Sequence, residues 1–200
     1  MTEAAPAPLA PGFDDGVMDA TRCFRTILTA MARPAGILDL PVRPPAPAGL
    51  NAGVAAVLLT LADADTPVWL GPGVETPEAR DHLRFHAGCP LVDDPARAVF
   101  AVLPADGDLA PLDALSLGTA EYPDRSATVI LKADGLSDTA GPWFSGPGIL
   151  VRRRLAVIPA AADLWPRIRA NGRDFPRGLD WIFATPESVA ALPRTAKVED

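Results

Sequence analysis

The chain has 200 residues, 48% of them hydrophobic, which suits one globular domain and excludes a disordered chain. Its formal net charge of −7 argues against a general attraction to nucleic acid or to an anionic membrane surface. No apolar run reaches the ~18 residues of a membrane span, no signal-peptide pattern is visible, and two cysteines without a framework fit a reducing cytoplasm.

Residues 1–12 are rich in alanine and proline and are predicted to form a mobile leader, with a single α/β domain over residues 13–200. Asp14 or Asp15 is expected to cap a first helix that ends at Pro34. The apolar residues that recur at helical spacing predict its buried face: Phe24, Ile27, Leu28 and Met31.

A strand is predicted at Ile37–Val42, followed by a proline-rich connector. The second helix carries apolar residues at positions i, i+3, i+4 and i+7, and its opposite face is also apolar, so it should be buried: Val54, Val57, Leu58 and Leu61. Pro67 forces the chain out of the helix, and Val68–Leu70 is predicted to be a buried strand. The other elements are expected to pack around this junction.

Asp63, Asp65 and Thr66 form an acidic corner between the second helix and the buried strand. One interpretation is local turn chemistry, because short polar side chains bond to nearby backbone in turns. The other is a role in a functional pocket. The sequence leaves both open.

A third helix should begin at Thr76, with a hydroxyl cap followed by proline, and end before Gly88. His82 and His86 lie four residues apart, as in zinc helices, and Cys89 adds a soft ligand. The glutamate of the zinc motif is missing and a zinc site needs three or four placed ligands, so no metal site is predicted. His86 is expected to cap the end of its helix or to line a pocket.

The remaining elements continue the alternation of strands and helices. Predicted strands are Pro90–Val92, Ala98–Leu103, Thr128–Ala133, Ile149–Val151, Leu155–Ile158 and Leu179–Ala184. Predicted helices are Leu109–Ser116, Ala161–Arg169 and Pro186–Ala191. Trp143–Gly148 is predicted to be a turn, and Arg152-Arg153-Arg154 interrupts an apolar run. The fold class is α/β, with a mixed β-sheet flanked by helices in three layers.

The common catalytic motifs are absent. Gly146-Pro147-Gly148 precedes a strand and does not open a helix, so it is no dinucleotide loop. There is no P-loop and no Gly-x-Ser-x-Gly nucleophile motif. Motifs alone therefore indicate an α/β domain and no reaction.

Several segments, taken in order, resemble one family: Phe24–Met31, Val57–Leu70, Leu83–His86, Gly118-Thr119, Ala127-Thr128, Gly146–Ile149, Phe175–Asp180 and Leu192–Thr195. They resemble the PhnH family, whose members belong to the bacterial carbon–phosphorus lyase core complex of phosphonate metabolism. The resemblance covers nearly the whole chain. Two departures are Ala35, which separates Pro34 from Gly36, and Ala196, where a second threonine is common.

The resemblance implies a fold like the large domain of PLP-dependent transferases, without PLP and without another cofactor. It implies a cytoplasmic homodimer that joins subunits G, I and J. With subunits G, I and L, the system converts MgATP and an alkylphosphonate into α-D-ribose 1-alkylphosphonate 5-triphosphate and adenine. This chain is then expected to be a scaffold or site-completing subunit that is not catalytic alone.

Arginines in the family-like segments are candidates for binding phosphonate or triphosphate, since a guanidinium donates two hydrogen bonds at once. The alternative is that they pair with nearby aspartates, including Asp174, and lock loops at a dimer interface. The residues predicted for a pocket or interface are Asp63, Asp65, Thr66, Arg84, His86, Arg177, Asp180, Arg194 and Thr195.

Two alternative functions remain. A stand-alone PLP enzyme needs a lysine for its internal aldimine, and the chain offers only Lys132, within a predicted strand, and Lys197, near the C-terminus. A pure interaction module with no ligand pocket is the other alternative.

Overall fold

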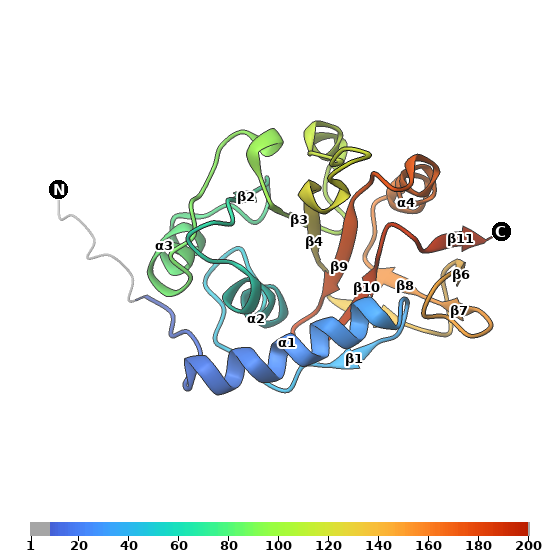
Figure 1. Ribbon diagram of the computed structural model, residues 1–200. Coiled ribbons are helices and arrows are strands. Elements are labelled where there is room, and N and C mark those ends of the chain that lie inside the picture. The colour runs from blue at the N-terminus through green and yellow to red at the C-terminus, as the bar shows by residue number, and fades with distance from the viewer. Residues whose placement is uncertain (1–8, 200) are drawn as a thin grey trace.

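A computed structural model of the chain describes residues 9–199, so residues 1–8 of the predicted leader, which spans residues 1–12, lie outside the described residues. A six-stranded sheet forms the centre, in the spatial order β1-β10-β9-β4-β3-β2 (Figure 1). The strands are β1 (Leu38–Asp39), β2 (Val68–Leu70), β3 (Phe100–Pro104), β4 (Thr128–Lys132), β9 (Asp180–Ala184) and β10 (Ser188–Leu192).

The sheet is mixed, as predicted. Strands β2, β3, β4 and β9 are parallel, whereas β10 runs antiparallel to β9 and β1 antiparallel to β10. Val102, Ile130 and Ile182 lie opposite one another across the three central strands. These strands are short apolar runs because a parallel sheet is covered on both faces.

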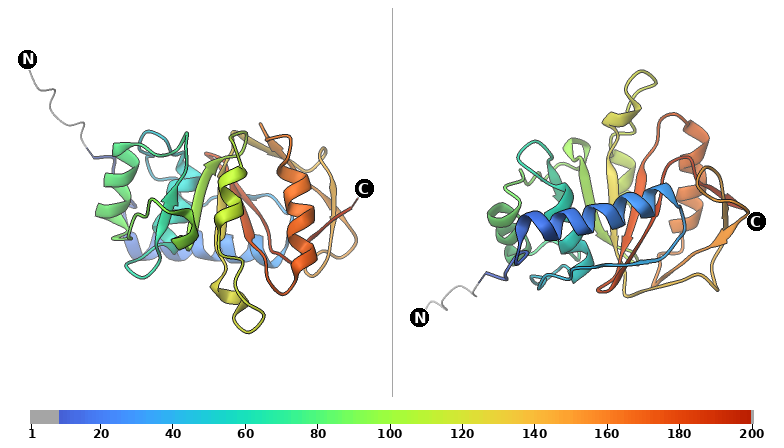
Figure 2. Two further views of the ribbon diagram at one scale, coloured as in Figure 1. Left: turned by 90° about the horizontal axis from the view of Figure 1, so that it is seen from above. Right: turned by 60° about the horizontal axis from the view of Figure 1, so that its bottom comes forward.

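Side chains alternate along the strands and divide the core into two layers. Val102 and Ile130 pack in a cluster with residues of three helices, α1 (Gly16–Ala32), α2 (Ala52–Leu61) and α3 (Pro77–His86). Leu103 and Leu131 point to the opposite face, toward α4 (Leu164–Asn171) and the 3₁₀ helix η2 (Ala110–Ala114). Figure 2 shows α1 and α4 on opposite sides of the strands, so the three-layer arrangement is confirmed.

Two small sheets lie at the end of the molecule far from α3 (Figure 1). One joins β11 (Lys197–Glu199), β6 (Trp143–Ser145) and β7 (Arg153–Arg154). The other joins β5 (Gly135–Ser137) and β8 (Ala156–Ile158). The predicted turn that begins at Trp143 is therefore partly a strand, because its pairing partner lies far along the chain at β11. Further 3₁₀ turns are η1 (Pro95–Arg97), η3 (Pro123–Arg125) and η4 (Gly172–Asp174).

Some predicted elements are wrong or shorter than expected. The helix predicted at Pro186–Ala191 is strand β10, reached through a tight turn in which the Thr185 hydroxyl accepts a hydrogen bond from the Ser188 amide. Ile149–Val151 is not a strand, and Leu150 is 99% exposed. Pro90–Val92 is reduced to one bridge at Leu91, and Ile37–Val42 to the two residues of β1. A helix at Leu109–Ser116 is the five-residue η2.

The predicted buried face of α1 is only partly correct. Asp19, Cys23, Ile27 and Ala30 are its buried residues, and Ile27 alone belongs to the predicted stripe. Phe24 and Leu28 are 48% and 56% exposed. Small residues at positions 23 and 30 let α1 approach α2 and β10 closely. The spacing of apolar residues predicts the helix correctly, but it does not distinguish the buried face from the exposed face beside it.

The outer face of α1 carries a continuous exposed line at helical spacing, which we call the α1 ridge: Val17, Thr21, Phe24, Leu28 and Ala32. Helix α2 largely fits its prediction, since Gly53 to Leu58 are all buried, although Leu61 of the predicted face is only half-buried. None of the helices between residues 9 and 199 is long and apolar enough to cross a membrane.

Candidate functional site

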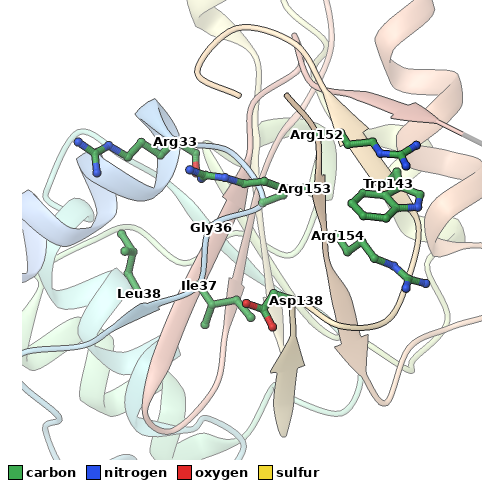
Figure 3. Close-up of a pocket in the computed structure, with 10 residues that line it drawn as sticks. Arg33, Gly36, Ile37, Leu38, Asp138, Trp143, Arg152, Arg153 and Arg154 are labelled. Atoms are coloured by element: carbon green, nitrogen blue, oxygen red, sulfur yellow. The ribbon is translucent and has the colours of Figure 1, made fainter. Parts of the chain in front are cut away.

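The most distinctive hollow is a cavity of about 450 Å³ between the end of α1, the chain that leads into β1, and strand β7 (Figure 3). We call it the arginine cavity. Its lining residues are Arg33, Ala35, Gly36, Ile37, Leu38, Asp138, Trp143, Arg152, Arg153 and Arg154. Its volume falls within the range of small-molecule sites.

The cavity is basic although the protein is acidic. Within the described part of the chain, four arginines line it and Asp138 is the single carboxylate that does so. Within residues 9–199, none of these four arginines forms an ion pair with a carboxylate. Other arginines of the chain do form such pairs: Arg22, Arg43, Arg80, Arg84, Arg167 and Arg194. The cavity therefore brings together four arginines whose charge no carboxylate of residues 9–199 neutralises through an ion pair.

Arg153 bridges β7 to the end of α1. Its Nη1 donates to the carbonyl oxygens of Arg33, at 3.2 Å, and Pro34, at 3.5 Å. Gly36 makes room for this bridge, because a Cβ there would lie 2.9 Å from the same Nη1 atom. The guanidinium of Arg153 is thus fixed at the cavity wall while its other N–H groups have no partner among the described residues.

The neighbouring arginines hold Trp143. Arg152 lies 4.2 Å and Arg154 5.3 Å from the centroid of the Trp143 ring, and Figure 3 shows the indole between the two. The Nε of Arg154 also donates to the Gly141 carbonyl at 3.1 Å. Both guanidinium groups therefore have a defined partner at the cavity wall.

The lining supports binding more than bond cleavage. Of the residues that the structure describes, no serine, cysteine, histidine or lysine lines it, so they offer no nucleophile–base pair of the usual kinds. Fixed guanidinium groups can hold a phosphate or phosphonate through charge-assisted hydrogen bonds. The geometry is that of a site that positions an anion.

Sequence reasoning did not identify this cavity. It treated Arg152-Arg153-Arg154 as an interruption of an apolar run and did not connect them with Arg33. Three consecutive arginines shortly after Trp143 were the available signal. Their partners at the end of α1 lie more than a hundred residues away and only the fold brings them together.

The acidic corner forms a local turn. Thr66 Oγ1 donates to a carboxylate oxygen of Asp63 at 3.0 Å, and the Asp65 amide donates to the same oxygen at 2.9 Å. Asp63 and Asp65 are both exposed. These contacts favour the local interpretation, and the turn rests on the carboxylate of Asp63, not on that of Asp65.

Arg194 and Asp180 form a closed ion pair. Two nitrogens of the Arg194 guanidinium donate to the two oxygens of the carboxylate, at 3.2 and 2.5 Å, and the Arg194 amide donates to it at 2.8 Å. The guanidinium also donates to the Pro123 carbonyl and to the hydroxyl of Ser126. With its donors engaged, Arg194 ties the loop before β4 to the chain after β10.

Arg177 and Thr195 lie close to this ion pair. Arg177 is on the loop before β9, and the Arg194 guanidinium reaches the carbonyl of the adjacent Pro176 at 3.5 Å. Thr195 lines a second cavity of about 440 Å³ together with Phe175 and Arg194. Arg177, Asp180, Arg194 and Thr195 are thus brought together, apart from the arginine cavity.

The predicted residues of α3 form a separate group. The exposed side chain of Arg84 lies 3.7 Å from Asp81. His86 Nε2 and His82 Nδ1 lie 3.0 and 3.2 Å from the Ala10 carbonyl oxygen, so both rings can hold the N-terminal segment against α3. His82 is fully buried, and burial lowers the pKa of its ring, with a smaller contribution from His86.

Among residues 9–199, no three histidine, cysteine or carboxylate side chains come together as a metal site would require. Cys23 and Cys89 are free and buried, and burial raises the pKa of both thiols. A raised pKa disfavours the thiolate, so neither cysteine is poised as a nucleophile.

Comparison with known proteins shows the family to which the chain belongs. The model of the family described as "Bacterial phosphonate metabolism protein (PhnH)" matches residues 11–199. A protein of Rhizobium meliloti (strain 1021), "Alpha-D-ribose 1-methylphosphonate 5-triphosphate synthase subunit PhnH", is 37% identical over 194 residues, which cover 94% of each chain. A protein of Stutzerimonas stutzeri with the provisional name C-P lyase subunit protein HtxG is 26% identical over 175 residues, covering 88% of this chain and 83% of that protein.

Proposed function

Because the chain belongs to the bacterial phosphonate metabolism protein (PhnH) family, we propose that it is a subunit of a carbon–phosphorus lyase complex. The Rhizobium meliloti relative is named as a subunit of a ribose 1-methylphosphonate 5-triphosphate synthase. The corresponding reaction joins an alkylphosphonate to the ribose of MgATP and releases adenine. The complex is proposed to work in the cytoplasm, where unpaired thiols such as Cys23 and Cys89 stay reduced.

The arginine cavity is the observation that supports a positioning role within this complex. It offers guanidinium groups without carboxylate partners for an anionic substrate, and among residues 9–199 its lining has no serine, cysteine, histidine or lysine to act as a nucleophile. Positioning lowers a barrier only when another group supplies the chemistry. We therefore assign this chain the role of a scaffold that completes a site, with the reacting groups on partner subunits of the G, I and J type.

A homodimer is also proposed, with the α1 ridge as its contact surface. Large apolar side chains that are exposed together on one helix face favour association. The charges flanking the ridge are self-complementary, since Asp14 and Asp15 precede the helix whereas Arg33 follows its last turn. A two-fold axis across the helix would bring the acidic end of one copy to the basic end of the other.

We propose a distant relation of the sheet to the large domain of PLP-dependent transferases, without use of the cofactor. Lys132, at the end of β4, donates its Nζ to the Gly49 carbonyl at 2.9 Å, which gives the amine a structural contact. Incubation with pyridoxal phosphate should yield no aldimine absorbance band. A band that disappears in Lys132→Ala would contradict the cofactor-free proposal.

Reconstitution tests the central proposal. The purified chain should leave MgATP and methylphosphonate unchanged, and addition of subunits G, I and L should release adenine with formation of the ribose phosphonate. Omission of this chain should sharply reduce phosphonate transfer. Arg153→Gln should reduce it as well, whereas Arg43→Gln, which removes an exposed ion pair with Glu187 outside the cavity, should not. Adenine release by this chain alone would show that it is the catalyst.

A further inference from the structure

The arginine cavity contains more positive charge than one compact anion can use. Figure 3 shows Arg153 reaching toward the end of α1 while Arg152 and Arg154 extend the other way, beside Trp143. This divergence agrees with the alternation of side chains along β7, in which Arg153 and Arg154 are consecutive residues and which Arg152 directly precedes. The guanidinium groups are therefore spread along the cavity and do not converge on one point.

Spread charges fit an extended ligand. A single phosphonate has one cluster of oxygens and can reach one guanidinium pair, whereas a chain of phosphates carries charge over several groups. Figure 3 shows Asp138 beside Ile37, which directly precedes β1, and the carboxylate of Asp138 repels negative charge there. The anion should accordingly lie along the wall formed by Arg153 and Arg154.

The same geometry disfavours recognition of a nucleobase. Among residues 9–199, Trp143 is the only aromatic residue that lines the cavity. Arg152 and Arg154 lie over its ring, so a base would have to displace a guanidinium in order to stack. The cavity should thus recognise the phosphates and leave the base to other surfaces.

We propose that the arginine cavity is a binding site for an oligophosphate chain, such as the triphosphate of a nucleotide or of a ribose 5-triphosphate. Arg153 is its central contact, because its backbone anchors fix the guanidinium in place. The two arginines stacked on Trp143 extend the site along the cavity. The identity of the natural ligand rests on the proposed function, whereas the existence of the site does not.

Calorimetric titration of the purified full-length chain with tripolyphosphate tests this at low ionic strength, where such contacts are least screened. Tripolyphosphate and ATP should bind with similar affinity, methylphosphonate more weakly, and adenosine without measurable heat. Arg153→Gln should weaken tripolyphosphate binding on the order of tenfold or more. Arg152→Gln, at an exposed position, provides a second variant and should weaken it by a smaller factor.

Arg22→Gln and Arg43→Gln are matched controls, because each removes an exposed arginine that does not line the cavity. Equal weakening in the controls, or no tripolyphosphate binding, would overturn the site. Tighter binding of methylphosphonate than of tripolyphosphate would contradict the proposal that the ligand is an extended anion. Binding of adenosine would contradict the proposal that the cavity does not recognise the base. Reconstituted phosphonate transfer reports on the proposed function separately, because a chain that binds no oligophosphate can still serve as a scaffold.

Discussion

At the scale of single residues, Arg194 shows how a charged side chain becomes structural. Its side chain is 14% exposed and that of Asp180 is 18% exposed, so the pair is largely withdrawn from water. Arg194→Gln should lower the free energy of unfolding by about 2 kcal/mol, because a carboxylate and two acceptors lose charged donors. Urea denaturation measures this.

The exposed pair of Arg84 and Asp81 is the matched control. Arg84→Gln should change the free energy of unfolding by about 0–1 kcal/mol, as is usual for solvated ion pairs. Equal losses in both variants would mean that the network around Arg194 adds nothing to stability, and the residue would again become a candidate for ligand binding.

His82 makes stability depend on pH in a defined direction. Burial keeps its pKa below the ordinary 6.5, with a smaller effect of His86 and an opposing hydrogen bond to Ala10. As the pH falls through that ordinary value, the unfolded chain gains a proton that the folded chain resists, so stability decreases. Above it, both states are neutral and the contribution vanishes.

Urea denaturation at about pH 7.5 and about pH 5.5 therefore spans the relevant interval. The free energy of unfolding should decrease more for the parent protein than for His82→Gln, whose amide does not titrate. Phe85→Gln, at the exposed neighbouring position, should retain the pH dependence of the parent. If His82→Gln retained it as well, other groups would be responsible.

At the scale of elements, Asn51 joins a helix to the sheet. Its Oδ1 accepts from the Val54 amide at 2.8 Å and caps α2. Its Nδ2 donates to the carbonyls of Ala133, at 3.1 Å, and Ala184, at 3.0 Å, just beyond β4 and at the end of β9. One side chain thus fixes the start of the buried helix against two neighbouring strands.

Asn51→Ala should cost about 2–3 kcal/mol, since it removes a helix cap and leaves two carbonyls with fewer donors. Asp15→Ala removes the cap of α1, which has no such link to the sheet, and should cost about 1 kcal/mol. Thermal and urea denaturation of both variants compare the two caps. Equal costs would show that the contacts to β4 and β9 contribute little.

The elements that the sequence predicted are those specified by local chemistry. Thr76-Pro77 starts α3, and the apolar run Thr128–Lys132 is a central strand. The elements it missed depend on distant pairing. β6 pairs with β7 and β11. For β10 the sequence predicts a helix, since alanines such as those at positions 190 and 191 favour helices, but pairing with β9 makes this segment a strand.

The same distinction applies to the sites. Arg194 and Asp180 are predicted as candidates because both lie in segments that resemble the family. The structure brings the two side chains together as an ion pair. Prediction of the arginine cavity would require knowing that Arg153 of β7 donates to the Arg33 carbonyl at the end of α1, 120 positions away in the chain. No pattern within one segment carries that information, so this contact could not be predicted.

At the scale of the whole molecule, the α1 ridge and the arginine cavity are neighbours. Both end at the last turn of α1, where Ala32 belongs to the ridge and Arg33 to the cavity. The loop between β6 and β7 closes against this turn, because a Cβ at Gly148 would lie 2.3 Å from the Ala32 carbonyl oxygen. A second copy on the ridge would therefore place its acidic helix start near the basic cavity.

Disruption of the α1 ridge should therefore yield a monomer. Light scattering of the parent at micromolar concentration should give roughly twice the 20.9 kDa chain mass. Phe24→Asp should reduce it to the single chain, because a carboxylate in the middle of an apolar contact loses its hydration. Phe85→Asp is the control, since Phe85 is 74% exposed on α3, outside the ridge, and should leave the dimer intact. A dimer that survives Phe24→Asp with an unchanged dissociation constant would exclude the ridge as its interface, and a parent that is monomeric throughout would contradict the proposed homodimer.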